Sequence, residues 1–154
     1  MDGVLNYYLL GNTATSGQPT AEQFERIAQA GYTAVINLAM STSDNALPDE
    51  GAIVSALGIQ YHAIAVPFDA PAKKHFRAFV ELMDVLPAER TWVHCALNAR
   101  VSAFMFKYLH DVCGCAAAES STGLLEQWRP QMDAVWQAFM TMDCSDMTAS
   151  RRQN

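Results

Sequence analysis

The chain has 154 residues, of which 51% are apolar and 17% are charged, so it can fill one packed core but not two independent domains. Sixteen acidic and ten basic residues give a net charge of -6, which argues against nucleic acid as a partner. No apolar run reaches the roughly 18 residues of a membrane span, and the N-terminus lacks the basic start of a signal peptide. We therefore expect one cytoplasmic domain over residues 1–142, with no membrane partner, and a flexible tail over residues 143–154.

The first part of the chain carries one strand signal and one helix signal. Residues 6–10 resemble a short strand, and residues 11–19 are rich in turn-forming residues. Thr20 and Gln23 have the spacing of a capping box, in which the threonine oxygen accepts a backbone N–H and the glutamine side chain reaches back. The sequence therefore predicts a helix that begins after Thr20 and ends at Gly31, where a left-handed backbone favours glycine.

The middle of the chain repeats this alternation. Residues 32–38 are apolar and β-branched without strict alternation, as expected of a strand that is covered on both faces in a parallel sheet. After a polar loop over residues 41–47, residues 48–57 predict a helix whose first-turn proline is compatible with a helix start. Residues 59–66 predict the next strand. Two prolines in residues 67–71 then require a loop.

The C-terminal half predicts three more helical regions and one strand. Residues 76–83 carry an apolar stripe at helical spacing, and residues 91–93 form a strand that leads into the segment discussed below. A helix follows over residues 100–114. The last helical stretch, residues 124–139, contains Pro130, so it is either kinked or divided into two helices in series.

Strands that alternate with helices of this length predict an α/β fold: a central, mostly parallel sheet of four to five strands with helices on both faces. Parallel strands end at the same edge of a sheet. The loops after Leu38, Val66 and Val93 should therefore lie side by side at the edge where ligands usually bind in open α/β sheets.

The most informative segment is Val-His-Cys-Ala-Leu-Asn-Ala-Arg, residues 93–100, at a predicted strand end and helix start. A loop that wraps over a helix N-terminus points several backbone N–H groups at one place, where they and the helix dipole favour an anion. The same field favours a thiolate, so Cys95 is the candidate nucleophile. Arg100 adds a planar set of donors that can hold two oxygens of a phosphate group. The predicted phosphate-binding residues are Ala96, Leu97, Asn98, Ala99 and Arg100.

Asn98, Asp69 and His94 are each assigned a role at this loop, and Ser102 is a further supporting residue. Asn98 lies at its middle, and asparagine is the non-glycine residue that best tolerates a positive φ. Asp69 follows a strand that ends at the same sheet edge, so its carboxyl is the candidate general acid for protonating a leaving oxygen. His94 is predicted to order the loop by hydrogen bonding. A metal role for His94 has little support, because no second ligand motif lies nearby.

At these residues the sequence resembles the bacterial tyrosine-phosphatase-like family that also occurs fused in beta-lactamase-hydrolase-like proteins. His94-Cys95 with Arg100, the upstream Asp69 loop, Ser-Gly-Gln-Pro at residues 16–19 and Gly-Tyr-Thr-Ala-Val-Ile-Asn-Leu at residues 31–38 carry the resemblance, which spans roughly residues 7 to 140. The family belongs to the cysteine-dependent phosphatase superfamily. The resemblance implies a cysteine-phosphatase-like fold, hydrolysis of phosphate monoesters through a phosphocysteine intermediate, and no metal or other cofactor.

The resemblance also implies a role for each site residue: Cys95 as nucleophile, Arg100 as phosphate clamp and Asp69 as general acid. The partners that it implies are a phosphorylated protein or small molecule as substrate, and a phosphate or sulfate anion in the loop.

The sequence departs from tyrosine and dual-specificity phosphatases in three places. Those enzymes place five residues between cysteine and arginine and then a serine or threonine, whereas here four residues intervene and Val101 follows Arg100. Ser102 stands where that hydroxyl would fall in a loop of full length. Ala39 occupies a position where relatives often carry an arginine.

The shorter loop resembles in length the active loop of rhodaneses, which transfer sulfur through a cysteine persulfide. It also offers fewer N–H donors to an oxyanion. Two alternatives therefore remain beside a phosphatase: a rhodanese-like sulfurtransferase, and a non-catalytic module that binds phosphate or a phosphopeptide.

Three other groups of residues receive no catalytic role. The two cysteines that flank Gly114 are interpreted as a helix terminus with incidental thiols, and the three tryptophans as packing residues. The acidic residues Asp44, Asp49 and Glu50 are interpreted as a solvated loop and helix start, with no role beyond the rim of the site.

Overall fold

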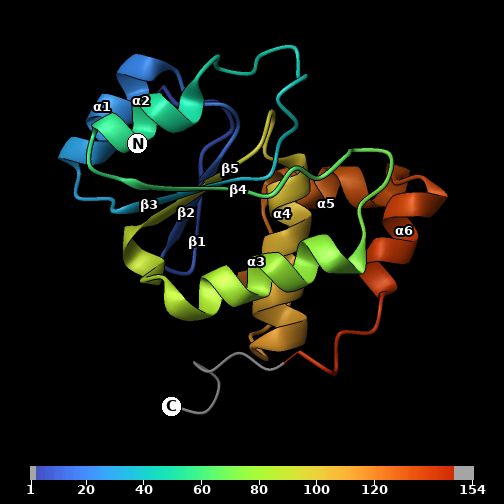
Figure 1. Cartoon of the computed structure of the whole chain (residues 1–154). Helices are drawn as coiled ribbons and strands as arrows, with labels where there is room; N and C mark the ends of the chain where they lie inside the picture. Colours follow the sequence, from blue (N-terminus) through green and yellow to red (C-terminus); the bar gives the residue numbers. More distant parts are fainter. Residues whose placement is uncertain (1–2, 148–154) are drawn as a thin grey trace.

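The centre of the fold is a five-stranded sheet (Figure 1), in a computed structural model that describes residues 3–147. Its strands are β1 (Tyr8–Leu10), β2 (Thr13–Ser16), β3 (Ala34–Asn37), β4 (Gln60–Ala63) and β5 (Thr91–His94). They lie in the order β1-β2-β5-β3-β4, in which β1 is antiparallel to β2 and the other neighbours are parallel. The predicted α/β fold with a mostly parallel sheet of four to five strands is confirmed.

Helices cover both faces of this sheet, as predicted. The helices are α1 (Ala21–Gln29), α2 (Glu50–Ala56), α3 (Lys73–Val85), α4 (Ala99–Phe106), α5 (Gly123–Trp128) and α6 (Ala134–Thr141). Short 3₁₀ turns lie at Ala88–Arg90, Ala118–Ser120 and Arg129–Gln131, and a π-helical segment, Lys107–Val112, continues α4. Figure 1 shows α1 and α2 on one side of the sheet and α3 to α6 on the other. None of the helices within residues 3–147 is long and apolar enough to span a membrane.

The face under α1 and α2 buries the smaller of two apolar cores. Phe24 from α1 and Val54 from α2 pack there with Val35 and Trp92 from the sheet. Ile36, the next residue along β3, belongs to the core on the opposite face. Because both faces are covered, the strand has the uninterrupted apolar sequence from which it was predicted.

The opposite face carries the larger core, which is centred on phenylalanine rings. Phe76 and Phe79 from α3 contact Phe104 from α4 at centroid distances of 5.8 and 5.6 Å, and Phe104 stacks on Phe139 from α6 at 4.8 Å. Each buried ring of this size contributes about 1.5–3 kcal/mol of transfer free energy. The apolar stripe predicted over residues 76–83 is therefore the face of α3 that holds this layer onto the sheet.

Local signals set several helix ends as predicted. The Thr20 side chain accepts the N–H of Gln23 at 3.1 Å, and the Gln23 side chain accepts the N–H of Thr20 at 2.9 Å, which completes the capping box of α1. Gly31 follows α1 with a φ of 98°. Pro130 lies in the 3₁₀ turn between α5 and α6, so the last helical stretch consists of two helices in series.

The prediction that residues 11–19 form only turns is wrong, because they contain β2. This strand is buried along its whole length between β1 and β5. Its Thr-Ala-Thr-Ser sequence carries little apolar signal, but its hydroxyls have partners inside the protein. Thr15 Oγ1 donates to the Tyr8 carbonyl at 2.7 Å, and Ser16 Oγ accepts from Trp92 Nε1 at 2.8 Å. Polar side chains that are hydrogen-bonded in this way can occupy a buried strand.

The predicted start of the second helix is also wrong. The helix begins at Glu50, so Pro48 lies two residues outside it. The reason is the residue between them: Asp49 adopts a left-handed backbone with a φ of 58° and cannot belong to a right-handed helix.

Residues 143–154 are predicted to be a flexible tail, and residues 148–154 lie outside the described residues. Within the described part, Cys144 and Met147 are buried against the larger core. The carboxylate of Asp146 pairs with Lys73 at 3.2 Å and with Arg77 at 3.0 Å. Residues 144–147 therefore pack against α3.

The cysteines that flank Gly114 lie at the end of a helical segment, as interpreted. Cys113 is the C-cap of the π-helical segment, and Gly114 follows with a φ of 79°. Neither Cys113 nor Cys115 forms a disulfide with another cysteine in residues 3–147.

Candidate active site

The parallel strands end together at one edge of the sheet, and this edge holds the predicted site. His94 at the end of β5 is in register with Ser16 of β2 and Asn37 of β3. The next residues are also joined, because the Leu38 N–H donates to the His94 carbonyl at 2.8 Å and the Val66 N–H to the Leu38 carbonyl at 3.1 Å. The three loops predicted to lie side by side therefore meet here.

A tight bend connects β5 to α4, and Asn98 forms its turn. Asn98 adopts a φ of 72°, in the left-handed region that was predicted for it. Its buried side-chain amide donates to the Asn6 carbonyl at 2.8 Å and to Thr15 Oγ1 at 3.1 Å. These bonds attach the bend to the N-terminal part of the chain, so the amide group as well as the backbone preference fits this position.

The carbonyls of the bend point to the surrounding protein, whereas its N–H groups do not. The Ala96 carbonyl accepts from the Gln18 N–H and from the Asn45 amide, each at 3.0 Å, and the Leu97 carbonyl accepts from the Asn6 amide at 2.9 Å. The backbone N–H groups of residues 96–101 make no hydrogen bond to any residue within 3–147. Several donors at the start of one helix are therefore available to an oxyanion.

Arg100 is a buried cation at the base of this bend. Its side chain is only 6% exposed, and Nη1 donates to the Val66 carbonyl at 2.9 Å. Nε is buried without a hydrogen-bond partner, and no carboxylate among residues 3–147 forms an ion pair with the guanidinium. A buried charge is costly unless an opposite charge compensates it. An anionic ligand would supply both the missing charge and the missing acceptor.

Cys95 lies where β5 passes into the bend, and its thiol is free and fully buried at 0% exposure. Its N–H donates to the Ser16 carbonyl at 3.3 Å, which fixes the residue against β2. Its side chain belongs to the larger apolar core. The chain thus brings Cys95 and Arg100 to opposite ends of one short bend, the first held by the sheet and the second by the loop after β4.

Asp69 lies on a turn that Arg100 contacts through two neighbouring residues. The guanidinium bonds the Val66 carbonyl and lies 5.8 Å from the centre of the Phe68 ring. Trp136 Nε1 donates to the Phe68 carbonyl at 2.7 Å, which anchors the turn to α6. The Asp69 side chain is exposed and makes no hydrogen bond with any residue within 3–147. The turn is thus fixed beside the arginine, and its carboxyl is open to solvent.

His94 makes the contacts expected of a residue that orders the loop. The ring is fully buried, and Nδ1 lies 3.1 Å from the Cys95 carbonyl. Nε2 lies 2.7 Å from Glu50 Oε2, and the other carboxylate oxygen of Glu50 accepts from Gln18 Nε2 at 2.6 Å. The contacts of Glu50 and Gln18 were not predicted from the sequence. The interpretation of Glu50 as a residue of a solvated rim is wrong, because Glu50 is only 6% exposed.

Ser102 supports the bend through Asn98. Its hydroxyl donates to Asn98 Oδ1 at 3.3 Å and accepts from Thr122 Oγ1 at 2.8 Å. Thr122 in turn caps α5 by accepting the Leu125 N–H at 3.0 Å. The hydroxyl one turn into α4 therefore connects the bend to α5.

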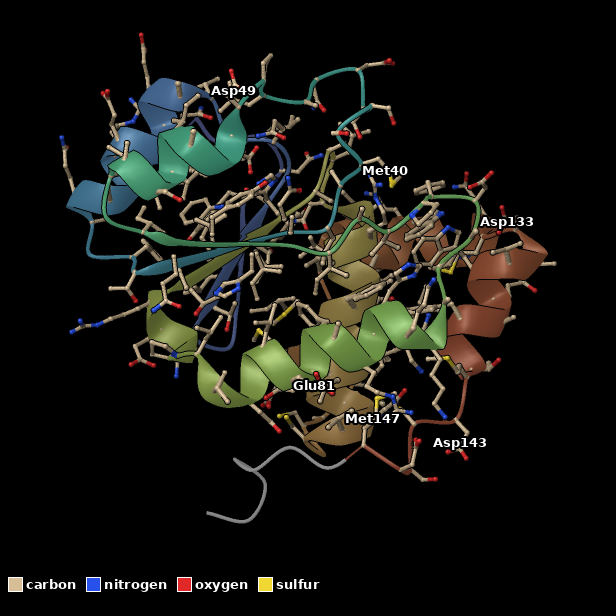
Figure 2. All side chains as sticks on the ribbon, in the orientation of Figure 1. Met40, Asp49, Glu81, Asp133, Asp143 and Met147 are labelled. Atoms are coloured by element: carbon tan, nitrogen blue, oxygen red, sulfur yellow. The ribbon has the colours of Figure 1, made fainter. Side chains whose placement is uncertain are left out.

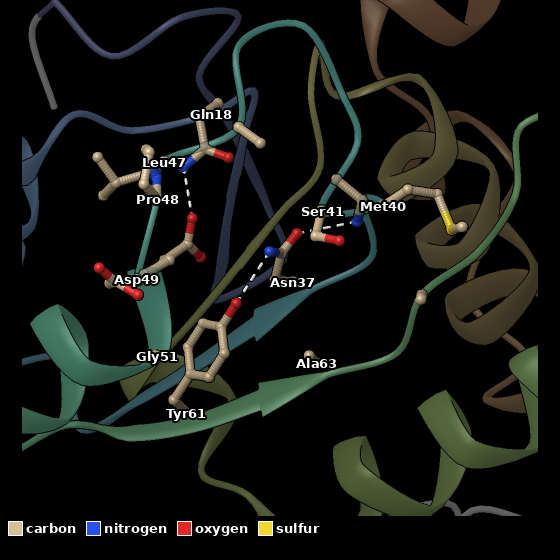
Figure 3. A pocket seen from close by; sticks show the side chains of 14 residues that line it. Gln18, Asn37, Met40, Ser41, Leu47, Pro48, Asp49, Gly51, Tyr61 and Ala63 are labelled. Carbon is tan, nitrogen blue, oxygen red and sulfur yellow. Dashed lines mark hydrogen bonds between the residues drawn. The ribbon is translucent and has the colours of Figure 1, made fainter.

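A cavity of about 390 Å³ lies at this edge of the sheet. It is bounded by the β3–α2 loop, α2 and the end of β4 (Figure 3), and its wall includes Asn37, Glu50 and Tyr61. Another cavity, of about 440 Å³, is lined by residues 42–45 and by residues 96–97 of the bend. Figure 2 labels Met40 and Asp49, which lie near the two ends of the segment that connects β3 to α2.

Fold and site together define an α/β protein with a candidate oxyanion site between a strand end and a helix start. No family model matches the sequence, and no curated protein matches it. Among solved structures, the chain is similar to a DUF442 protein from Shewanella putrefaciens CN-32 that is described as a proposed phosphatase. Identity is 31% over 90% of this chain and 91% of that chain, with a TM-score of 0.78.

Two further structures share the fold at lower identity. One is the core catalytic domain of the PP-IP phosphatase SIW14 from S. cerevisiae in complex with citrate, with 16% identity over 92% of this chain and 86% of that chain and a TM-score of 0.68. The other is TpbA from P. aeruginosa in complex with pTyr, with 17% identity over the same shares and a TM-score of 0.67. The chain belongs to the DUF442 family, whose similar member from Shewanella putrefaciens is described as a proposed phosphatase.

Proposed function

We propose that this chain hydrolyses phosphate monoesters through a phosphocysteine intermediate formed on Cys95. The observation that carries the proposal is Arg100, a buried guanidinium with an unpaired Nε and no carboxylate partner among residues 3–147. The unpaired N–H groups of residues 96–101 point to the same type of ligand, a tetrahedral oxyanion. The relationship to phosphatases supports phosphate as that oxyanion.

In the first step the Cys95 thiolate attacks phosphorus, so an S–P bond forms while the bond to the leaving oxygen breaks. The protonated carboxyl of Asp69 gives its proton to that oxygen. Arg100 and the loop N–H groups bind the three equatorial oxygens, whose charge they stabilise in the transition state. In the second step water attacks phosphorus, the S–P bond breaks, Asp69 takes the water's proton and the thiolate is regenerated.

The activity is tested by release of 4-nitrophenol from 4-nitrophenyl phosphate. We expect Cys95→Ser to lose all release above background, and Arg100→Ala to lose about 10²–10³-fold in rate. Cys113→Ser is the matched control, because that thiol lies at a helix terminus away from the bend, and its rate should equal that of the unmodified protein. Equal release by the unmodified protein and Cys95→Ser would refute the proposal.

Because only four residues separate Cys95 from Arg100, two other functions are tested beside phosphate release. Transfer of sulfur from thiosulfate to cyanide, with one added sulfur on Cys95, would identify a sulfurtransferase. Binding of sulfate or a phosphopeptide in calorimetry, without turnover, would identify a binding module. Either outcome would replace the phosphatase proposal.

A further inference from the structure

A buried chain of hydrogen bonds leads from α2 to the carbonyl of the candidate nucleophile. Gln18 Nε2 donates to Glu50 Oε1 at 2.6 Å, and Glu50 Oε2 lies 2.7 Å from His94 Nε2. On the other side of the ring, Nδ1 lies 3.1 Å from the Cys95 carbonyl. Glu50 and His94 have side chains only 5% and 0% exposed, so this contact is made away from water.

The partners determine where the protons lie. A carbonyl only accepts, so His94 Nδ1 carries a hydrogen and donates to the Cys95 carbonyl. One further proton lies between His94 Nε2 and Glu50 Oε2, either on the ring as an imidazolium–carboxylate pair or on the carboxyl. Both arrangements are neutral overall, which suits a buried pair. The Glu50 carboxylate supplies the negative charge that allows the ring to be an imidazolium.

Charged and titratable groups face this pair from several elements. Tyr61 on β4 lies next to Glu50. Burial raises the pKa of its hydroxyl to about 12, and the nearby Glu50 carboxylate acts in the same direction against the hydrogen bond from Asn37. Figure 3 shows Gln18 and Tyr61 on opposite sides of this corner of the cavity.

The other residues around His94 do not bring a second carboxylate into contact with its ring. From α1 the His94 ring meets an apolar ring, Phe24, at 5.9 Å. From the bend it meets Cys95, with Arg100 at the far end. Asp49 adjoins Glu50 in sequence but is exposed. Glu50 is therefore the carboxylate that contacts His94 in the part of the chain that the structure describes.

We propose that Glu50 is a positioning residue that holds His94 as a hydrogen-bond donor to the Cys95 carbonyl and as a cation beside the nucleophile. The effect on the thiolate follows from charge, since a positive ring next to Cys95 favours the ionised sulfur. This inference deepens the proposed function, because it assigns the residue that prepares the nucleophile.

Glu50→Gln separates a charge effect from a purely structural one. The glutamine amide can donate to Nε2 of a neutral His94, and its oxygen can still accept from Gln18, so every hydrogen bond of the chain has a replacement. What is lost is the negative charge and one proton. Asp49→Asn is the matched control, because it neutralises the adjacent exposed carboxylate and keeps a residue that tolerates the left-handed backbone.

The measurement is the rate of Cys95 alkylation by iodoacetamide as a function of pH, followed by peptide mass spectrometry to separate Cys95 from the other cysteines. In Glu50→Gln we expect the midpoint of the profile to rise by about one pH unit, which is about tenfold slower alkylation below both midpoints. Asp49→Asn should match the unmodified protein. Alkylation needs no turnover, so the result is independent of whether the chain releases phosphate.

If the profile of Glu50→Gln overlies that of the unmodified protein, the proposal is overturned. Glu50 would then contribute only the hydrogen bonds that glutamine also makes, and its charge would have no effect on Cys95. If Glu50→Gln does not fold, His94→Asn is the second variant. Its amide can still donate to the Cys95 carbonyl but carries no charge, and the same upward shift is expected. An unshifted profile for His94→Asn would equally refute the inference.

Discussion

Replacing Arg100 by methionine tests whether the bend is built around an anion. Without a ligand, two effects oppose each other. Loss of the bond to the buried Val66 carbonyl costs about 1.5–3 kcal/mol of unfolding free energy, because that bond has a charged donor. The same substitution removes the unpaired Nε and an uncompensated buried charge, which raises the free energy of unfolding by a similar amount. The free energy of unfolding of Arg100→Met should therefore lie within about 1.5 kcal/mol of the original value.

Adding sulfate should then stabilise the unmodified protein more than Arg100→Met. A ligand that binds only the native state stabilises it by RT ln(1 + [L]/Kd), which is about 2.7 kcal/mol at a hundredfold excess over Kd. Arg100→Met loses this increment, because the guanidinium that would hold two sulfate oxygens is gone. The exposed, ion-paired Arg77 provides the control, since Arg77→Met should keep the full increment.

The assay is urea unfolding followed by tryptophan fluorescence, in sodium sulfate and in sodium chloride of equal ionic strength. Sulfate also stabilises proteins in general by exclusion from their surface, so the quantity to compare is the sulfate increment of each variant. If Arg100→Met gains the same increment as Arg77→Met, the arginine does not hold an anion. If Arg100→Met is several kcal/mol less stable without sulfate, the guanidinium is a structural group.

Three further outcomes are expected. Asp69→Asn should slow hydrolysis of phenyl phosphate by about 10²–10⁴-fold but leave 4-nitrophenyl phosphate much less affected, because only the poorer leaving group needs an acid; equal losses would exclude this role. Gly17→Ala would place a Cβ 2.7 Å from the Ala96 carbonyl, so chemical unfolding should show a loss of about 1–3 kcal/mol, whereas Gly123→Ala, with 3.5 Å to its nearest neighbour, should show none. Burial raises the pKa of Tyr61 from 10.0 to about 12, so its contribution to stability is complete below pH 10 and is lost as the pH rises toward 12. Urea unfolding of Tyr61→Phe should therefore show a smaller loss of stability between pH 10 and 12 than the unmodified protein shows.

Several parts of the fold follow from short-range signals in the sequence. The capping box of Thr20 and Gln23, the left-handed Gly31 and the apolar stripe of α3 each depend on residues within one or two helical turns. The site bend belongs to the same class. A cysteine at a strand end and an arginine at a helix start require a sharp turn between them, and Asn98 is the residue that accepts its backbone.

The strand β2 could not be predicted from its own residues. Thr-Ala-Thr-Ser offers no apolar periodicity, and it forms a strand because β1 and β5 supply hydrogen bonds on both sides. Its hydroxyls are satisfied by Tyr8 and Trp92, the second of which lies 76 residues from its partner Ser16. Strand formation here is a property of the assembled sheet.

What the sequence determines by itself is the alternation of β3, β4 and β5 with helices and the sharp bend between Cys95 and Arg100, since both depend on interactions between neighbours along the chain. What the tertiary structure decides is which groups surround that bend. Glu50 and His94 lie 44 residues apart, and Arg100 and Val66 lie 34 apart. Neither contact has a local signal, because burial and partners for a charged side chain arise only when separate elements pack together. An acidic residue at a helix start thus becomes the buried partner of the histidine beside the nucleophile.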